Sequence, residues 1–398
     1  MSILDGKKFL ILDTETTSKN AGHPFDPANK LLFVGLYDGD NIRIFDIEFT
    51  EKPYGKSIQE IQDFLDGYDV IVAFNAKFDL HWLRRYGIDF SNHFVWDLQY
   101  AEFCFAGQQW SMPSCDDACS RRSLQGKLPF DHSIEHSRSA WVQYLHRDLI
   151  CEYDLFQAQR TDLGGERAGL LNLIWYGSQD LKITEEMEWN GLKYDVEKSL
   201  TIGDEILQKI AVLDSVLSDY SPHPSFSWAS PTHLSALLYG GIFKYETVET
   251  VYKTLKGGRV KERLHKVIKE IILPRLVEPF KTSGVKRNEK ETDQSRHYYS
   301  TDEGTLKTLK ASGSAKEIIK LLLTRRTLAK SVGTYYHGIP KKIEEMGWQN
   351  ELIHAQLNHC VAATGRLSSA KPNIQNLESS MRQCIVSRFP LHTQKTIG

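Results

Sequence analysis

Short apolar segments alternate with amphipathic ones through the first third of the chain, and this alternation constrains the fold more than any other feature. Residues 9–12, 31–47 and 70–74 are apolar segments of strand length, the second interrupted by a DGDN turn typical of a hairpin. Residues 57–67 and 76–87 have helical spacing. Strands alternating with helices predict an α/β fold in which helices cover a mixed β-sheet.

Size and composition set limits on the function. A chain of 398 residues is too long for one compact core, so we expect two or three domains. The sequence contains no apolar run of the roughly 20 residues that span a bilayer, and its N-terminus lacks a signal-peptide layout. Six scattered cysteines fit a reducing compartment. We therefore expect a cytoplasmic protein without a membrane partner. The net charge of −2 excludes a global basic field, so nucleic-acid binding would depend on local clusters.

Long amphipathic helices dominate from about residue 187. The pattern predicts helices over 196–220, 258–276 and 314–347, separated by polar loops. We place boundaries near residues 190 and 350, which divide the chain into an α/β region, a helical region and a short final region.

Two carboxylates, Asp13 and Glu15, close the first predicted strand. Side chains two residues apart in a strand point to the same side, so these two acids lie together at a sheet edge. A divalent cation between them would relieve their repulsion, although a solvated turn is the alternative for this pair alone. Asp79 lies just inside a helix that follows a buried strand, a geometry that can return a third acid to the same sheet end. Asn75 is expected to cap that helix.

A further acid with a tyrosine nearby to orient water would complete such a site. Three frames of the form Tyr-x-x-x-Asp compete, at 144–148, 153–157 and 176–180. The second frame lacks the acid, and the third runs into a helix that belongs by its pattern to the next region. In the first, one helical turn separates Tyr144 from Asp148, so both face the same way. We therefore select the first frame.

These residues resemble the 3′–5′ exonucleases of the four-acid, tyrosine-containing class. The resemblance implies a ribonuclease H-like domain in which two divalent metal ions, usually Mg²⁺ with Mn²⁺ as an alternative, promote in-line phosphoryl displacement. It assigns the metals to the four acids and the placement of water to Tyr144. The residues concerned are Asp13, Glu15, Asp79, Asp148 and Tyr144.

Three further residues match this class of exonuclease. Asn75 and Phe78, in FNAKFD, match its second motif and are expected to contact the DNA end. Asp97 lies where the class has a supporting aspartate, and a helix-cap role is equally open.

A zinc-finger spacing, C-x3-C-x12-H-x3-H, lies between these motifs. Its members are Cys115, Cys119, His132 and His136. Ser123 and Pro129 stand where such a finger carries an aromatic residue and a leucine, and residues 114–122 also read as a helix capped by Ser114. Zinc is therefore an alternative to an ordinary helix here.

Positive charge collects in the helical region, at 259–269, 281–290 and 325–330. Such clusters suit phosphate contacts along a duplex, although Lys and Arg also commonly solvate outer helix faces. Four motifs then occur in order: EMEWNGLKYD, WASPTHLSALLYG, TRRTLAKSVGTYYHGIPKKI and HAQLNHCVAATGRLSSAKPNIQNL. Together with the exonuclease motifs they closely resemble the family-A DNA polymerases, in a phage-like form. The resemblance covers nearly the whole chain.

This resemblance assigns a 3′–5′ exonuclease domain to residues 1–190, a helical thumb to 191–350 and an incomplete start of the polymerase palm to 351–398. It implies contacts with primer–template DNA, sequence-tolerant in the minor groove and along the backbone. The residues concerned are Arg326 and Lys330 in the thumb, and Thr364, Arg366, Asn373, Gln375 and Asn376 in the palm.

The family's palm acids and fingers are expected after Arg366, and no matching acid pair follows it. We therefore expect nucleotide addition to require a second polypeptide carrying the remaining palm and fingers. A split-gene subunit, an interrupted product and a truncated chain stay open. The predicted activity is metal-dependent proofreading on single-stranded 3′ ends and primer–template duplexes, in the host cytoplasm if the gene is a phage's. The alternatives are an inert DNA-holding subunit and an RNA-trimming exonuclease of the same class.

Overall fold

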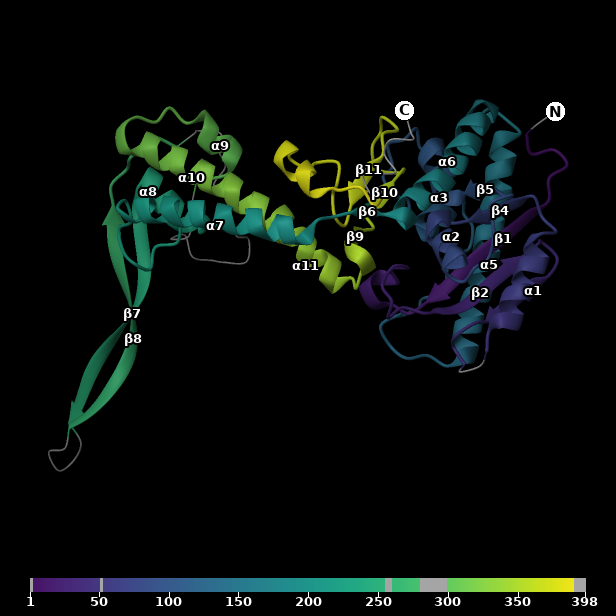
Figure 1. Ribbon diagram of the computed structural model, residues 1–398, viewed down its shortest axis with the longest axis horizontal. Helices are drawn as coiled ribbons and strands as arrows, with labels where there is room; N and C mark the ends of the chain where they lie inside the picture. Colours follow the sequence, from purple (N-terminus) through teal and green to yellow (C-terminus); the bar gives the residue numbers. More distant parts are fainter. Residues whose placement is uncertain (1–2, 51–52, 255–259, 280–298, 390–398) are drawn as a thin grey trace. The chain divides into compact units, whose positions relative to one another are not determined.

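A five-stranded mixed sheet, of order β3-β2-β1-β4-β5, forms the centre of the N-terminal region in a computed structural model that describes residues 3–50, 53–254, 260–279 and 299–389 (Figure 1). β1 pairs antiparallel with β2 and parallel with β4; β2 and β3 form the predicted hairpin. β5 continues the sheet parallel to β4. The predicted strands are confirmed, with bounds Phe9–Thr16 (β1), Leu31–Tyr37 (β2), Ile42–Asp46 (β3) and Val70–Ala73 (β4). The fifth strand, β5 (Phe94–Asp97), was not predicted.

Helices cover both faces of this sheet. Because consecutive strand residues point to opposite faces, Leu10 and Leu12 belong to a different apolar core from Ile11. The core that contains Leu10 is completed by α1 and α2, and the core that contains Ile11 by α3 to α6. The helix bounds are Gly55–Leu65 (α1), Ala76–Arg85 (α2), Leu98–Phe105 (α3), Cys115–Arg121 (α4), Arg138–Leu163 (α5) and Leu171–Asn190 (α6). No helix among the described residues is both long and apolar enough to cross a membrane.

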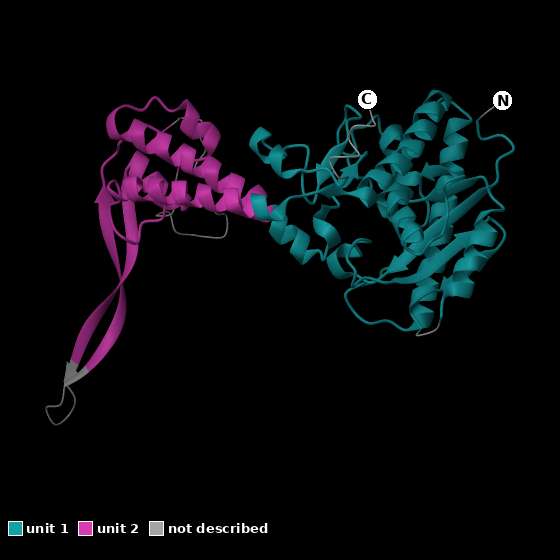
Figure 2. Cartoon of the chain, in the orientation of Figure 1, with its two compact units in different colours: residues 1–198, 339–398 teal, residues 199–338 magenta. Residues whose placement is uncertain are grey.

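The chain divides into two compact units, one of residues 1–198 and 339–398, the other of residues 199–338 (Figure 2). The final region that the sequence separates at residue 351 thus lies in the same unit as the N-terminal sheet. In this region β10 pairs with β11, and β9 pairs with β6, a short strand that follows α6. The elements are β6 (Leu192–Lys193), α11 (Gly338–Glu345), β9 (Leu352–Ile353), β10 (Gln356–Asn358) and β11 (Ser368–Ala370).

One buried carboxylate, Glu188 of α6, joins these late residues to the α/β region. Its Oε1 lies 2.5 Å from Lys77 Nζ and accepts a 2.5 Å hydrogen bond from the Leu357 N–H, while Oε2 is 2.8 Å from His81 Nε2. Burial alone would raise the pKa of Glu188, but the bonds from His81 and Lys77 hold that pKa below its ordinary value. The ionised carboxylate therefore connects α2, α6 and β10.

The second unit contains helices and one long hairpin. An apolar core around Leu234, Phe243 and Leu322 joins α8, α9 and α10 to the base of the hairpin. The elements are α7 (Val196–Ser218), which begins in the first unit, α8 (Pro231–Tyr239), β7 (Gly241–Thr254), β8 (Val260–Leu273), α9 (Glu303–Thr308), α10 (Gly313–Ser331) and the π-helical η4 (Val332–Tyr336).

The helix predicted over 258–276, and with it a wholly α-helical thumb, is wrong: this segment contains β8, which pairs with β7. Its apolar spacing fits a helix, but the preceding segment is rich in β-branched and aromatic residues that favour strands. Ion pairs between the two strands stabilise their pairing: Lys266 lies 2.7 Å from Glu246, and Lys269 lies 2.7 Å from Glu249. These lysines already have acidic partners. Lys281, Lys286, Arg287 and Lys290 lie outside the described residues.

Helix α6 approaches α3 closely at Gly177. A Cβ atom there would lie 2.2 Å from the ring of Tyr100, so Gly177→Ala should force the ring to move. We expect the substitution to reduce the free energy of unfolding by about 1–3 kcal/mol, measured by denaturant titration. Gly169→Ala, where nothing lies within 4 Å, is the control and should stay within about 0.5 kcal/mol. Equal stability of the two variants would contradict the close approach.

Candidate active site

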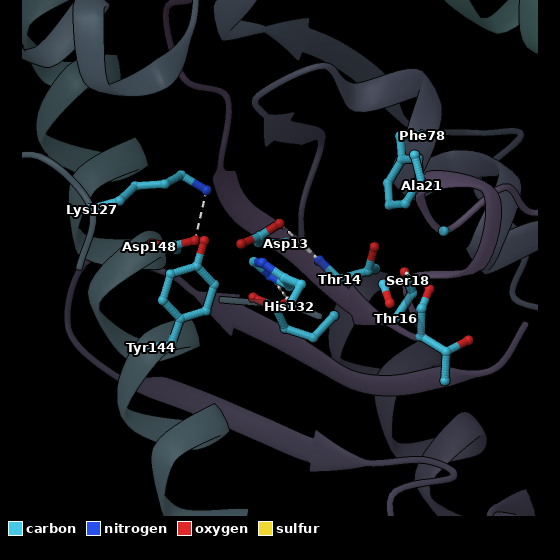
Figure 3. Close-up of a pocket in the computed structure, with 13 residues that line it drawn as sticks. Asp13, Thr14, Thr16, Ser18, Ala21, Phe78, Lys127, His132, Tyr144 and Asp148 are labelled. Carbon is cyan, nitrogen blue, oxygen red and sulfur yellow. Dashed lines mark hydrogen bonds and ion pairs between the residues drawn. The ribbon is translucent and has the colours of Figure 1, made fainter. Parts of the chain in front are cut away.

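Three predicted carboxylates converge at the end of β1. Asp13 and Glu15 come from β1 and Asp148 from α5, which packs on that strand. One oxygen of each lies within 4.8 Å of the others. They line a cavity of about 300 Å³ together with Phe78, Tyr144 and residues 16–18 (Figure 3). The i, i+2 spacing in β1 therefore places both of its acids on the cavity, as the strand pattern predicts.

Asp79 lies against β1 but outside this group of three. Its Oδ1 accepts hydrogen bonds from the backbone N–H of Thr14, at 3.1 Å, and from the Thr14 hydroxyl, at 2.6 Å. Burial and the nearby Asp13 raise the pKa of Asp79 well above its ordinary value. Asp79 thus holds the residue between the two β1 acids.

The cavity concentrates negative charge away from water. Burial raises the pKa of Asp13 and, more strongly, that of Glu15, to which Asp13 and Asp148 also contribute. Burial likewise raises the pKa of Asp148 to about 7, against an opposing effect of Lys127. Among the described residues, the buried Oδ1 of Asp148 has no hydrogen-bond partner. Clustered carboxylate oxygens with a spare buried acceptor fit a hard divalent cation.

Two residues of the site, Lys127 and His132, were not predicted. Lys127 Nζ lies 2.6 Å from Asp148 Oδ2, and His132 Nε2 lies 3.6 Å from Glu15 Oε2. Both come from the irregular loop between α4 and α5, visible in Figure 3 beside the acids. A loop residue has no periodicity from which its direction can be predicted, and the zinc pattern is the only role that the sequence suggests for His132.

That zinc pattern is not assembled. His132 faces Glu15, and His136 stacks on Phe130 at 4.0 Å between ring centroids. Cys115 and Cys119 instead lie with Cys151 in a buried group of thiols. The helical alternative is the observed one, because Ser114 Oγ accepts from the backbone N–H of Asp117 and so caps α4.

Of the three tyrosine frames, only the selected one lies at the acids. Tyr144 is buried against Phe130, with the ring centroids 4.4 Å apart, and its hydroxyl points toward Asp148 (Figure 3). Burial raises the pKa of Tyr144, so the hydroxyl keeps its proton at neutral pH. Tyr153 packs on Tyr37 elsewhere, and Tyr176 is 61% exposed.

The two residues of the second motif, FNAKFD, do not both contact the cavity as predicted. Phe78 lines the cavity, whereas Asn75 is exposed and outside the lining. Asn75 stands at the N-cap position of α2 in a left-handed conformation, and its side chain makes no capping bond, so the predicted cap is wrong. Asp97 replaces it: its two carboxylate oxygens accept from the backbone N–H groups of Ala76 and Tyr100, each at 2.7 Å. Asp97 is thus a helix cap in this structure.

The predicted DNA contacts of the final motif are on the surface. Ser369 organises the turn after β11 by accepting from the Ile374 N–H at 3.1 Å and donating to the Pro372 carbonyl at 3.2 Å. The side chains around it are exposed: Thr364, Arg366, Asn373, Gln375 and Asn376.

The two residues of the second unit that are predicted to contact DNA, Arg326 and Lys330, differ in their exposure. Arg326, on α10, is partly buried and donates to the backbone carbonyl of Thr301. Lys330, one turn later, is exposed. The guanidinium of Arg326 is therefore already engaged in a hydrogen bond within its own unit.

The chain is similar to known DNA polymerases over nearly its whole length. The family model for DNA polymerase family A matches residues 274–391. DNA polymerase I of Aquifex aeolicus is 26% identical over 95% of this chain and 56% of its own length. DNA polymerase I of Synechocystis is 25% identical over 76% of this chain and 26% of its own.

The fold of this chain is similar to that of a solved polymerase structure. The POL domain of Pol1 from M. smegmatis, in complex with DNA primer-template and dNTP, aligns with a TM-score of 0.65 and 18% identity, over 96% of this chain and 55% of that one. The chain thus spans 56% of the Aquifex aeolicus protein, 55% of the M. smegmatis chain and 26% of the Synechocystis protein. By its ordered motifs and these similarities, the chain resembles the family-A DNA polymerases, whose family model matches residues 274–391.

Proposed function

We propose that this chain is a metal-dependent 3′–5′ exonuclease that removes terminal nucleotides from DNA and so serves proofreading within a family-A polymerase. The observation that carries the proposal is the convergence of Asp13, Glu15 and Asp148, whose ligand oxygens lie within 4.8 Å of one another at an open cavity. A ribonuclease H-like assignment of residues 1–190 is part of the proposal, supported by the mixed sheet with β1 at its centre.

Each residue has a role that its position supports. Asp13, Glu15 and Asp148 would hold divalent cations, with Mg²⁺ as the natural ion and Mn²⁺ as a substitute. The bound metal would supply a Lewis acid that activates water and neutralises phosphate charge. Asp79 would keep the two β1 acids in place through Thr14, and the Tyr144 hydroxyl would orient the water. Phe78 offers a ring against which a terminal base can stack.

The exposed polar side chains of the final motif would hold primer–template DNA. Arg366, Asn373, Gln375 and Asn376 carry long donors that can reach minor-groove acceptors shared by all base pairs. Thr364 and Lys330 would contact the backbone, with Lys330 acting from the second unit. Arg326 and Asn75 are weaker candidates, since Arg326 is engaged with Thr301 and Asn75 lies outside the cavity lining.

The first test is cleavage of a 3′-labelled single-stranded DNA in Mg²⁺. Asp13→Asn should lower the rate by about 100-fold or more, because it removes a charged ligand from a preorganised site. Asp180→Asn, the exposed acid of the rejected tyrosine frame, is the matched control and should cleave like the wild type. Equal rates in all three proteins would refute the assignment. DNA binding without any cleavage would indicate a holding subunit, and preference for RNA an RNA-trimming enzyme.

Tyr144→Phe tests the proposed placement of water. Removing only the hydroxyl should reduce the cleavage rate by about 10-fold to 100-fold while DNA binding, measured by fluorescence anisotropy, stays the same. Tyr176→Phe, in the exposed frame, should change neither quantity. A weaker DNA affinity with an unchanged rate at saturating DNA would instead place Tyr144 in substrate binding.

Metal and pH should act together on stability. The pKa of Asp148 is raised to about 7 in the folded metal-free protein, whereas an unfolded chain releases this proton near pH 4. Between about pH 4 and pH 7 the folded protein therefore keeps a proton on Asp148 that the unfolded chain has lost. This contribution to stability is therefore lost as the pH rises through about 7. Mg²⁺ displaces that proton, so its increase in Tm over EDTA should be larger at about pH 8 than at about pH 5.5. Asp148→Asn should reduce the difference, which Asp13 and Glu15 would still support; an equal increase at both pH values in the wild type would count against a metal at this site.

A further inference from the structure

We propose that Lys127 takes the place of one cation at this site, so that the site binds a single divalent metal ion. The proposal rests on the proposed function only in treating the carboxylates as metal ligands. It departs from the two-ion arrangement implied by the resemblance.

The available ligands are sufficient for one ion. Asp13, Glu15 and one oxygen of Asp148 form the group within 4.8 Å. The other oxygen of Asp148, Oδ2, is occupied by Lys127 Nζ at 2.6 Å, and Oδ1 of Asp79 is occupied by two hydrogen bonds from Thr14. What is left open at Asp148 is the buried Oδ1. Three converging carboxylates and a few waters complete the coordination of one Mg²⁺.

The ammonium of Lys127 lies beside the acids that would have to hold a second ion. Its side chain is 24% exposed and contacts Asp148, with the Tyr144 ring centroid 5.9 Å away. Burial opposes its charge, but the fields of Asp13, Asp148 and Glu152 outweigh burial and raise the pKa of Lys127, which keeps it protonated. A divalent ion beside this fixed positive charge would be repelled.

The loop that carries Lys127 is fastened on both sides, so the lysine is not a surface side chain that happens to reach inward. The Lys127 N–H donates to Asp116 Oδ1 on α4 at 2.8 Å. Arg147 of α5 donates to the Gly126 carbonyl at 2.9 Å, and Cys151 of α5 donates to the Gln125 carbonyl at 3.1 Å. Two helices thus direct the loop toward the acids.

The test counts Mn²⁺ ions bound by the intact chain, by electron paramagnetic resonance and calorimetry, without relying on nuclease activity. The wild type should bind one ion that Asp148→Asn weakens by at least about tenfold. Lys127→Met, which keeps the length of the side chain and removes the charge, should bind two. Lys127→Arg restores the positive charge and should return the count to one.

A matched control is Lys182→Met, whose ammonium donates to the backbone carbonyls of Ser91 and His93 in the same unit, away from the acids; its count should stay at one. Two ions in the wild type, or one ion in Lys127→Met with unchanged Tm, would overturn the proposal. If the Tm shows that Lys127→Met is misfolded, the numbers of Mn²⁺ ions bound by the wild type and by Lys127→Arg test the proposal.

Cleavage assays separate this proposal from the proposed function. One bound ion in the wild type without DNA cleavage would refute the exonuclease and leave the assignment of Lys127 intact. Two bound ions with cleavage would refute the role of Lys127 alone, and no bound Mn²⁺ would refute both.

Discussion

Concentrated negative charge at the end of β1 is the constraint on which the candidate site depends. Asp13, Glu15 and Asp148 lie close together, and Glu15 and Asp148 are buried, an arrangement that costs free energy unless a cation compensates it. The protein supplies part of that compensation itself, through Lys127. The loop between α4 and α5, irregular as it is, therefore belongs to the chemistry of the site as much as the strand and the helix that carry the acids.

The same rule explains how the last residues of the chain are joined to the N-terminal α/β region. Glu188 is nearly inaccessible to water, yet its pKa is held low because Lys77, His81 and the Leu357 N–H all bind its carboxylate. A buried charge that is fully hydrogen-bonded requires all of its partners, since removing any one of them leaves an unpaired buried group. This junction gives a physical reason for residues 339–398 to form one compact unit with residues 1–198.

Sequence patterns predicted well wherever local spacing determined the outcome. The strands, the DGDN hairpin and the face shared by Tyr144 and Asp148 follow from the period of a strand or a helix. Prediction failed where two distant segments decide together. Residues 260–273 have helical spacing, but pairing with 241–254 makes them a strand. Asn75 has the residue type of a cap, but Asp97, folded against the helix start, makes the capping bond.

The sequence by itself determined the resemblance to family-A DNA polymerases, the alternation of strands and helices, and which acids and tyrosine were candidates, because motif order and side-chain periodicity are properties of the chain. The tertiary structure alone decided that Asp79 supports Thr14 rather than joining the group of three acids, that the cysteines meet Cys151 instead of the histidines, and that Lys127 enters the site. The reason is that these contacts join residues through loops and opposite faces of packed helices, whose directions depend on the packing of the whole unit and not on the spacing of residues along it.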